Sequence, residues 1–287
     1  MPSSRLATPS TRRSAGFTPS PGRARRAGHS ALARVNAPGL ATAAGLVAVW
    51  ELAVRTGLAD YQSLPAPSAV LASFEPLIAS GELPAHLAHT LTVTLAGWVA
   101  AAVIGVSFGV LLGLSATAYR YSLTSFEVVR AVPPVALVPA AVLIFGFSMS
   151  MELVLVVYAG AWPLLLNTLG GVRAVPAERF DVAAMLRLPR LAAIRKIVLP
   201  AALPEIVVGL RLALSMCLVL AVVAEMVGNP EGLGRALVRA RQALQPEQML
   251  AYVVTAGVLG VVLNAGFQTA ARAVLPTTET GEGAGAG

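Results

Sequence analysis

A few polar side chains in a mostly apolar sequence are the ones whose types could support chemistry. His86 and His89 lie about one helical turn apart, a spacing that can hold a metal ion. No carboxylate or cysteine accompanies them, so the preferred interpretation is a pair of interfacial histidines, and no metal is expected. Cys217, the single cysteine, lies in an apolar run, which excludes an intrachain disulfide and predicts a small packing residue.

Four further polar residues interrupt apolar runs. Asn167 and Thr168 could bond to a neighbouring helix or contact a polar solute. Arg211 could extend to the membrane surface, pair within a helix bundle, or attract an anion. Glu225 lies about 31 Å along a helix axis from Pro204, which predicts an outer interfacial position, where it could also act in a gate.

Several catalytic motifs are absent from the sequence. It has no G-x-x-x-x-G-K-[ST] phosphate loop, because the only lysine, Lys196, follows Arg195 instead of a glycine. It also has no H-E-x-x-H motif and no recognisable Ser/His/Asp cluster. Catalysis by this chain alone is therefore not expected, and no cofactor is expected to bind to it.

The elements that position these residues are predicted to be membrane helices. Hydrophobic residues make up 56% of the chain and charged residues 12%, against roughly 25% charged in soluble domains. The apolar runs are long and do not alternate strictly, which favours an all-α membrane protein over a barrel. We expect six transmembrane helices, at about 40–58, 87–114, 126–147, 151–172, 204–227 and 250–274.

The Lys/Arg distribution predicts the topology. Residues 1–36 carry seven Arg and no acid, which predicts a disordered cytoplasmic tail. The loop 173–203 has six cations and is expected inside, whereas the acidic loop 59–86 is expected outside. The loop 228–249 conflicts with the rule, since it contains Arg235, Arg239 and Arg241 yet must lie outside. The membrane domain then covers 37–275, a flexible tail covers 276–287, both termini are cytoplasmic, and the cations do not indicate nucleic-acid binding.

Small residues and prolines predict how the helices pack. Gly105, Gly109 and Gly113 recur every four residues and predict close approach of another helix, in packing that is either static or mobile. Pro133, Pro134 and Pro139 predict a kink in the third span, which is either structural or lines a pathway.

One charged segment, residues 178–204, separates the fourth and fifth spans. Helical character runs from Glu178 to Leu186, Pro189 ends it, and a second helical piece covers Leu191 to Leu199. Pro200 and Pro204 are expected to punctuate entry into the fifth span. Such a helix–turn–helix could lie among lipid head groups or dock into a groove of a soluble partner.

Several motifs together carry a family resemblance. They are Asp181-Val-Ala-Ala184, Arg195-Lys-Ile-Val-Leu-Pro-Ala-Ala-Leu-Pro204, Gly209-Leu-Arg-Leu-Ala213 and Val223-Ala-Glu-Met226. With them the chain, over roughly residues 45–275, resembles ABC transporter permeases of the nitrate/sulfonate/taurine/bicarbonate type. The resemblance implies a type I importer permease in a bacterial plasma membrane, assembled as a homodimer with cytoplasmic subunits that bind ATP and an external solute-binding protein. The alternative is an ATPase-independent channel or secondary carrier whose charged loop binds lipid.

The resemblance also implies roles for named residues. The loop corresponds to the family's "EAA" coupling helix, which contacts the ATPase through Glu178, Phe180, Asp181, Ala183, Ala184, Met185 and Arg187. Asn167, Thr168, Arg211 and Glu225 become candidates for the translocation pathway. The chain departs from the family at Arg187, where a glycine is usual, because only glycine takes positive φ cheaply; Pro189 could supply another turn. Asp181 and Val182 also replace the usual Glu and Ala.

Overall fold

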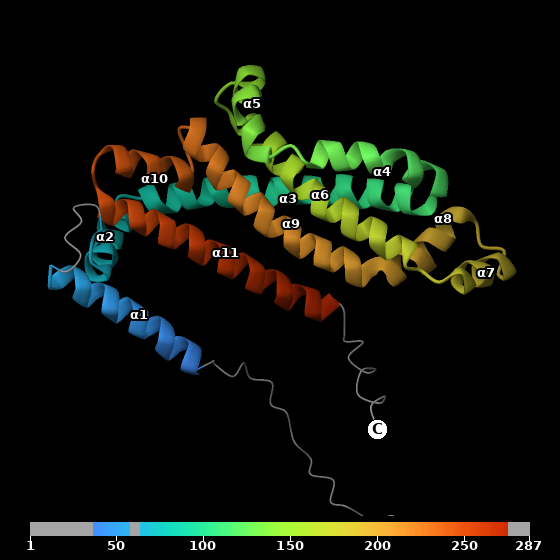
Figure 1. Ribbon diagram of the computed structural model, residues 1–287, viewed down its shortest axis with the longest axis horizontal. Coiled ribbons are helices and arrows are strands. Elements are labelled where there is room, and N and C mark those ends of the chain that lie inside the picture. Colours follow the sequence, from blue (N-terminus) through green and yellow to red (C-terminus); the bar gives the residue numbers. More distant parts are fainter. Residues whose placement is uncertain (1–36, 58–63, 275–287) are drawn as a thin grey trace, which may run out of the picture. The chain divides into compact units, whose positions relative to one another are not determined.

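The computed structural model of this chain describes residues 37–57 and 64–274, and these residues form helices without any strand (Figure 1). The expected tails, 1–36 and 276–287, lie outside the described residues. The chain divides within its first helix into two compact units, 1–46 and 47–287, and the packing below belongs to the second. The elements are α1 (Ala37–Arg55), α2 (Pro67–Ala79), α3 (Glu82–Leu114), α4 (Ala116–Arg130), η1 (Pro134–Leu137), α5 (Val138–Phe145), α6 (Met149–Arg173), α7 (Ala177–Met185), α8 (Arg190–Ala193), η2 (Ile194–Val198), α9 (Leu199–Gly228), α10 (Leu233–Gln242) and α11 (Pro246–Val274).

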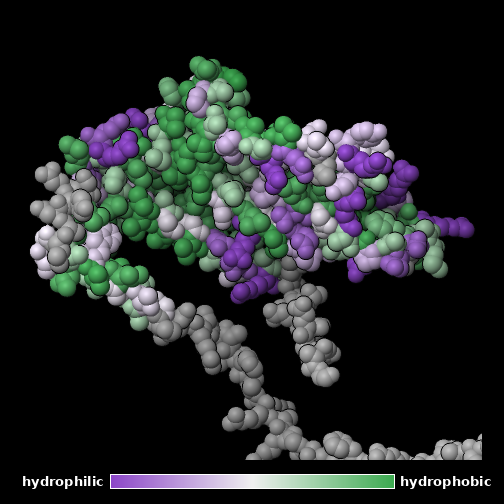
Figure 2. All heavy atoms as spheres, viewed as in Figure 1, coloured by the Kyte–Doolittle hydropathy of each residue, from purple (hydrophilic) through white to green (hydrophobic). Residues whose placement is uncertain are grey.

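Four helical stretches of the described chain are long and apolar enough to cross a membrane. They are Glu82–Leu114, Met149–Arg173, Arg190–Gly228 and Pro246–Ala273, and a bent helix pair would make a fifth. The all-α membrane fold agrees with the expectation, but the count of six does not, because α1, over the first expected span, is not among them. Hydrophilic side chains gather over α10 and over α4 and α7, with hydrophobic ones between (Figure 2).

The third expected span, 126–147, is not one helix. Its first residues belong to α4, which begins at Ala116, and the rest form η1 and α5. The two parts, Thr124–Arg130 and Pro134–Phe145, are bent by 74°. Proline lacks a backbone N–H, and the residue before a proline avoids the α conformation, so Pro133 and Pro134 break the helix where a milder kink was expected.

Helices α3, α6 and α9 pack closely at glycines. A Cβ built on Gly105 would lie 2.6 Å from Leu164 Cβ, and one on Gly109 would lie 2.6 Å from Thr168 Cβ. Gly113 meets Val172 of α6 at the same distance, so α6 is the close neighbour of the glycine row. Gly160 of α6 in turn faces Cys217 of α9, a buried packing residue.

The second helical piece of the charged loop is continuous with the fifth span. Helix α8, the π-helical η2 and α9 form one stretch from Arg190 to Gly228, with Pro200 in the first turn of α9 and Pro204 inside that helix. Pro200 cannot donate a hydrogen bond to the preceding turn, and the wider π turn accommodates that missing donor without ending the helix.

Candidate functional site

Helix α7 and the turn after it contain the residues expected to couple to an ATPase. Val175 before α7 and Ala183 on it are buried, and α7 packs against η2. The remaining expected contact residues are exposed: Glu178, Phe180, Asp181, Ala184, Met185 and Arg187. Because the Ala183 side chain is only 6% exposed, its place is in the internal packing of α7, and it is not available to a partner in this conformation.

Arg187 takes the left-handed conformation that glycine adopts at lower cost, with φ of 50°. Its N–H donates to the Ala184 carbonyl (3.0 Å), and the Leu188 N–H donates to the Ala183 carbonyl (3.0 Å). These two bonds form a Schellman motif with Arg187 at the position where glycine is usual. The turn is therefore built as a glycine would build it, and Pro189 follows as the N-cap residue of α8.

The four expected pathway residues do not gather in one place. Asn167 donates through Nδ2 to the Pro163 carbonyl of its own helix (2.8 Å), and Thr168 is buried against Gly109. Arg211 donates through Nε to Asn264 Oδ1 of α11 (3.0 Å), which is pairing within the bundle. A groove of about 380 Å³ between α9 and α11 includes Asn264 and Ser215 among its lining residues.

Glu225 lies near the end of α9, and its side chain is completely buried. Its Oε2 accepts a hydrogen bond from the Gly234 N–H (2.9 Å). The preceding N–H groups at the start of α10 are bound by α3, since Gly232 donates to His86 Nδ1 (3.1 Å) and Leu233 to Thr90 Oγ1 (2.9 Å). Three side chains from α3 and α9 thus satisfy the first N–H groups of α10, which its own helix cannot satisfy.

His89 lies among carboxylates that sequence reasoning missed. Its Nε2 is 2.9 Å from Glu152 Oε2, and its Nδ1 is 3.0 Å from Glu231 Oε2. Asn229 donates through Nδ2 to Glu152 Oε1, and that nitrogen is 3.2 Å from His89 Nε2. The expectation that no carboxylate accompanies the histidines is therefore wrong. The one sequence signal for Glu152 was its position as a carboxylate near the start of an apolar span. Its partners could not be read from the sequence, because they lie 63 and 77 residues away.

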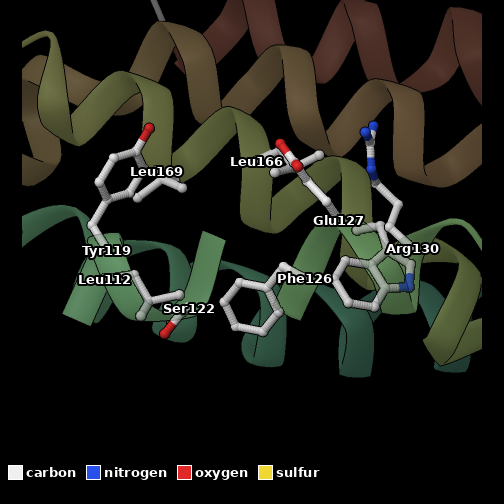
Figure 3. A pocket seen from close by; sticks show the side chains of 9 residues that line it. Leu112, Tyr119, Ser122, Phe126, Glu127, Arg130, Leu166 and Leu169 are labelled. Carbon is white, nitrogen blue, oxygen red and sulfur yellow. The ribbon is translucent and has the colours of Figure 1, made fainter. Parts of the chain in front are cut away.

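A small cavity of about 80 Å³ lies between α3, α4 and α6 (Figure 3). Its lining is mostly aromatic and apolar, with the charged pair Glu127 and Arg130 from α4. Beside it, the Arg173 guanidinium stacks over the Tyr119 ring at 3.9 Å. None of the expected pathway residues lines this cavity.

Known proteins similar to this chain in sequence and in structure are components of transport systems. The family model "binding-protein-dependent transport system inner membrane component" matches residues 101–279. The putative aliphatic sulfonates transport permease protein SsuC of Bacillus subtilis is 32% identical over 245 residues, covering 85% of this chain and 89% of that protein. The taurine transport system permease protein TauC of Escherichia coli is 29% identical, covering 83% of this chain and 88% of its own length.

A solved structure shares the fold. An inward-facing conformation of the MetNI methionine ABC transporter matches with a TM-score of 0.61 and 21% identity, over 70% of this chain and 99% of that one. The curated relatives are transport permeases, which are not enzymes. The chain therefore belongs to the binding-protein-dependent transport system inner membrane components, as a multi-pass ABC permease of the nitrate, sulfonate, taurine and bicarbonate type.

Proposed function

We propose that this chain is the permease subunit of an ATP-driven importer and forms the pathway for a small solute of the nitrate, sulfonate, taurine or bicarbonate kind. An external binding protein delivers the solute, and ATP binds to separate cytoplasmic subunits. Two identical permease chains make the pathway in a bacterial plasma membrane, with both termini and α7 in the cytoplasm. The curated relatives named for sulfonates, nitrate, taurine and bicarbonate support this range of solutes.

The exposed apolar and acidic side chains of α7 and of the turn after it carry the proposal. Met185 is 83% exposed and Leu186 64% exposed, next to the exposed acids Glu178 and Asp181. A short helix with an apolar tip and charged flanks fits a groove on a soluble partner. Because α7 packs on η2, which continues into α9, a displacement of α7 by the ATPase is passed directly to a membrane helix.

The decisive experiment is solute uptake into proteoliposomes that contain this chain with or without its ATPase. We expect accumulation of labelled taurine, an alkanesulfonate or nitrate only with the ATPase, enclosed ATP and the binding protein. Uptake by the chain alone would instead favour the ATPase-independent channel or secondary carrier.

The variant Asp181→Arg tests the docking surface within the same system. Reversing this exposed charge should abolish ATP-driven uptake while the permease dimer remains assembled, as judged by size-exclusion chromatography. Glu205→Arg is the matched control, because Glu205 is an exposed acid on α9 outside α7. Unchanged uptake by Asp181→Arg, or equal loss in both variants, would contradict the assignment of α7.

A further inference from the structure

We propose that His89, Glu152 and Glu225 form a binding site for a divalent transition metal, with zinc as the preferred ion. One ligand atom from each of these residues lies within 4.8 Å of the other two. The residues come from α3, α6 and α9, so a bound ion would link the three helices that form the centre of the bundle. This inference does not depend on the transported solute or on which side of the membrane the site faces.

The far atom of each ligand is already held by a neighbour. His89 Nδ1 lies 3.0 Å from the carboxylate of Glu231, Glu152 Oε1 accepts from Asn229, and Glu225 Oε2 accepts from the Gly234 N–H (2.9 Å). Metal-binding histidines and carboxylates characteristically have such outer partners, which fix their orientation. His89 Nε2 and one oxygen of each glutamate remain for the ion.

Glu225 supplies the independent sign that a ligand is required. Its side chain is completely buried, and its Oε1 has no hydrogen-bond partner among the described residues. A buried carboxylate oxygen without a partner is costly, and a second buried carboxylate, Glu152, lies close by. A divalent cation would complete the bonding of Oε1 and offset the mutual repulsion of the two glutamates.

The pair His89 Nε2 and Glu152 Oε2, 2.9 Å apart, also points to a shared cation. Two such atoms at that distance share either a proton or a metal ion, and the Asn229 amide competes for His89 Nε2 at 3.2 Å. Zinc ligands bind at roughly 2.0–2.2 Å from the ion, so side-chain rotation would close the set onto one centre.

The donor set selects the class of metal. One imidazole and two carboxylates suit zinc and its first-row neighbours, whereas magnesium and calcium prefer oxygen donors alone. Three protein ligands leave a fourth position for water or a further ligand. The His89 side chain is 13% exposed and its outer partner Glu231 is 67% exposed, so the ion has a route from solvent.

Metal binding to the purified, tag-free full chain in detergent tests this proposal. After chelator treatment we expect equilibrium dialysis to give about one zinc ion per chain, and cobalt to produce visible absorption bands that zinc abolishes. Glu225→Gln and His89→Gln should bind zinc at least tenfold more weakly. Glu82→Gln is the matched control, because Glu82 is an exposed acid at the first position of α3, outside the cluster.

The outcomes separate clearly. Absence of stoichiometric zinc and of cobalt bands in the unmodified chain overturns the proposal and leaves a proton shared between His89 and Glu152. Equal loss of zinc in Glu82→Gln overturns it as well, since the binding would then be superficial. If Glu225→Gln fails to fold, the proposal is tested by zinc binding to Glu225→Asp and by the cobalt bands of the unmodified chain.

Discussion

Two non-glycine residues take the left-handed backbone conformation, which favours glycine. Arg187 after α7 and Leu244 after α10 have φ of 50° and 56°. Leu244 donates to the Arg241 carbonyl (3.1 Å) and Gln245 to the Ala240 carbonyl (3.0 Å), so this turn is a Schellman motif as well. A non-glycine residue in this conformation costs roughly 1–2 kcal/mol, and the surrounding hydrogen bonds hold it there.

Replacing Arg187 with glycine should therefore stabilise α7. We expect Arg187→Gly to lower the cost of the left-handed turn by about 1 kcal/mol, which slows amide hydrogen exchange across α7 about fivefold. Leu186→Gly is the control, because Leu186 does not have positive φ and gains nothing from glycine there. Faster exchange in Arg187→Gly would show that the arginine side chain stabilises the turn by other contacts.

The Thr90 hydroxyl links α3 to the start of α10, and it also donates to the His86 carbonyl of its own helix. The buried hydroxyl accepts from the Leu233 N–H, so Thr90→Val should leave that buried donor unpaired at a cost of about 1–3 kcal/mol. Hydrogen exchange at the start of α10 should accelerate accordingly. Thr92→Val is the matched control, since the exposed Thr92 bonds only to Ala88 of its own helix. Equal effects of the two variants would contradict this role.

At the level of elements, close contact between α3 and α6 organises the bundle. Glycines along α3 allow the α6 backbone to approach, and glycines on α6 and α9 continue the contact toward the third helix. A Cβ added at these glycines cannot be accommodated without moving a helix, because the nearest atoms include backbone carbonyls. The glycine row is thus a packing requirement whether or not the helices also slide during transport.

Gly105→Ala tests that requirement. The added Cβ would lie 2.9 Å from the Ala161 carbonyl oxygen as well as 2.6 Å from Leu164, and overpacking of this kind costs about 1–3 kcal/mol. We expect a lower midpoint of thermal unfolding in detergent. Gly170→Ala on α6 is the control, because nothing lies within 4 Å of its added Cβ. A midpoint unchanged in Gly105→Ala would show that the helices separate easily.

For the molecule as a whole, the distribution of hydrophilic surface bears on its orientation in the membrane. Hydrophilic surfaces lie over α10 and over α4 and α7, and the apolar surface lies between them (Figure 2). The charged α7 loop is proposed to be cytoplasmic, which requires α10 to face outward in spite of its three arginines. In α10, four residues between Leu233 and Ala240 are buried hydrophobics, so the helix is held by packing as well as by its N-terminal bonds.

Cysteine labelling in intact cells decides the orientation. Leu244→Cys, at a position 87% exposed, should react with a membrane-impermeant maleimide from outside, whereas Met185→Cys, at a position 83% exposed, should react only after permeabilisation. The unmodified chain supplies the background, because its single Cys217 is buried. The reverse pattern would invert the proposed topology.

The sequence by itself determined the membrane fold, the family and the position of the charged segment between the fourth and fifth spans. Apolar runs, glycine spacing and the motif around Asp181 each involve residues close together in the sequence, so they can be recognised without the tertiary structure. The sequence also indicated where the third span would bend, through Pro133 and Pro134.

Only the tertiary structure decided which distant residues meet. Glu225, expected at an interface, is buried under α10, and His89 is paired with Glu152 and Asn229 across long stretches of chain. The turn at Arg187 is instead formed locally, by backbone hydrogen bonds to the Ala183 and Ala184 carbonyls. The contacts of Glu225 and His89 arise from packing between helices, which brings together residues that lie far apart in the sequence.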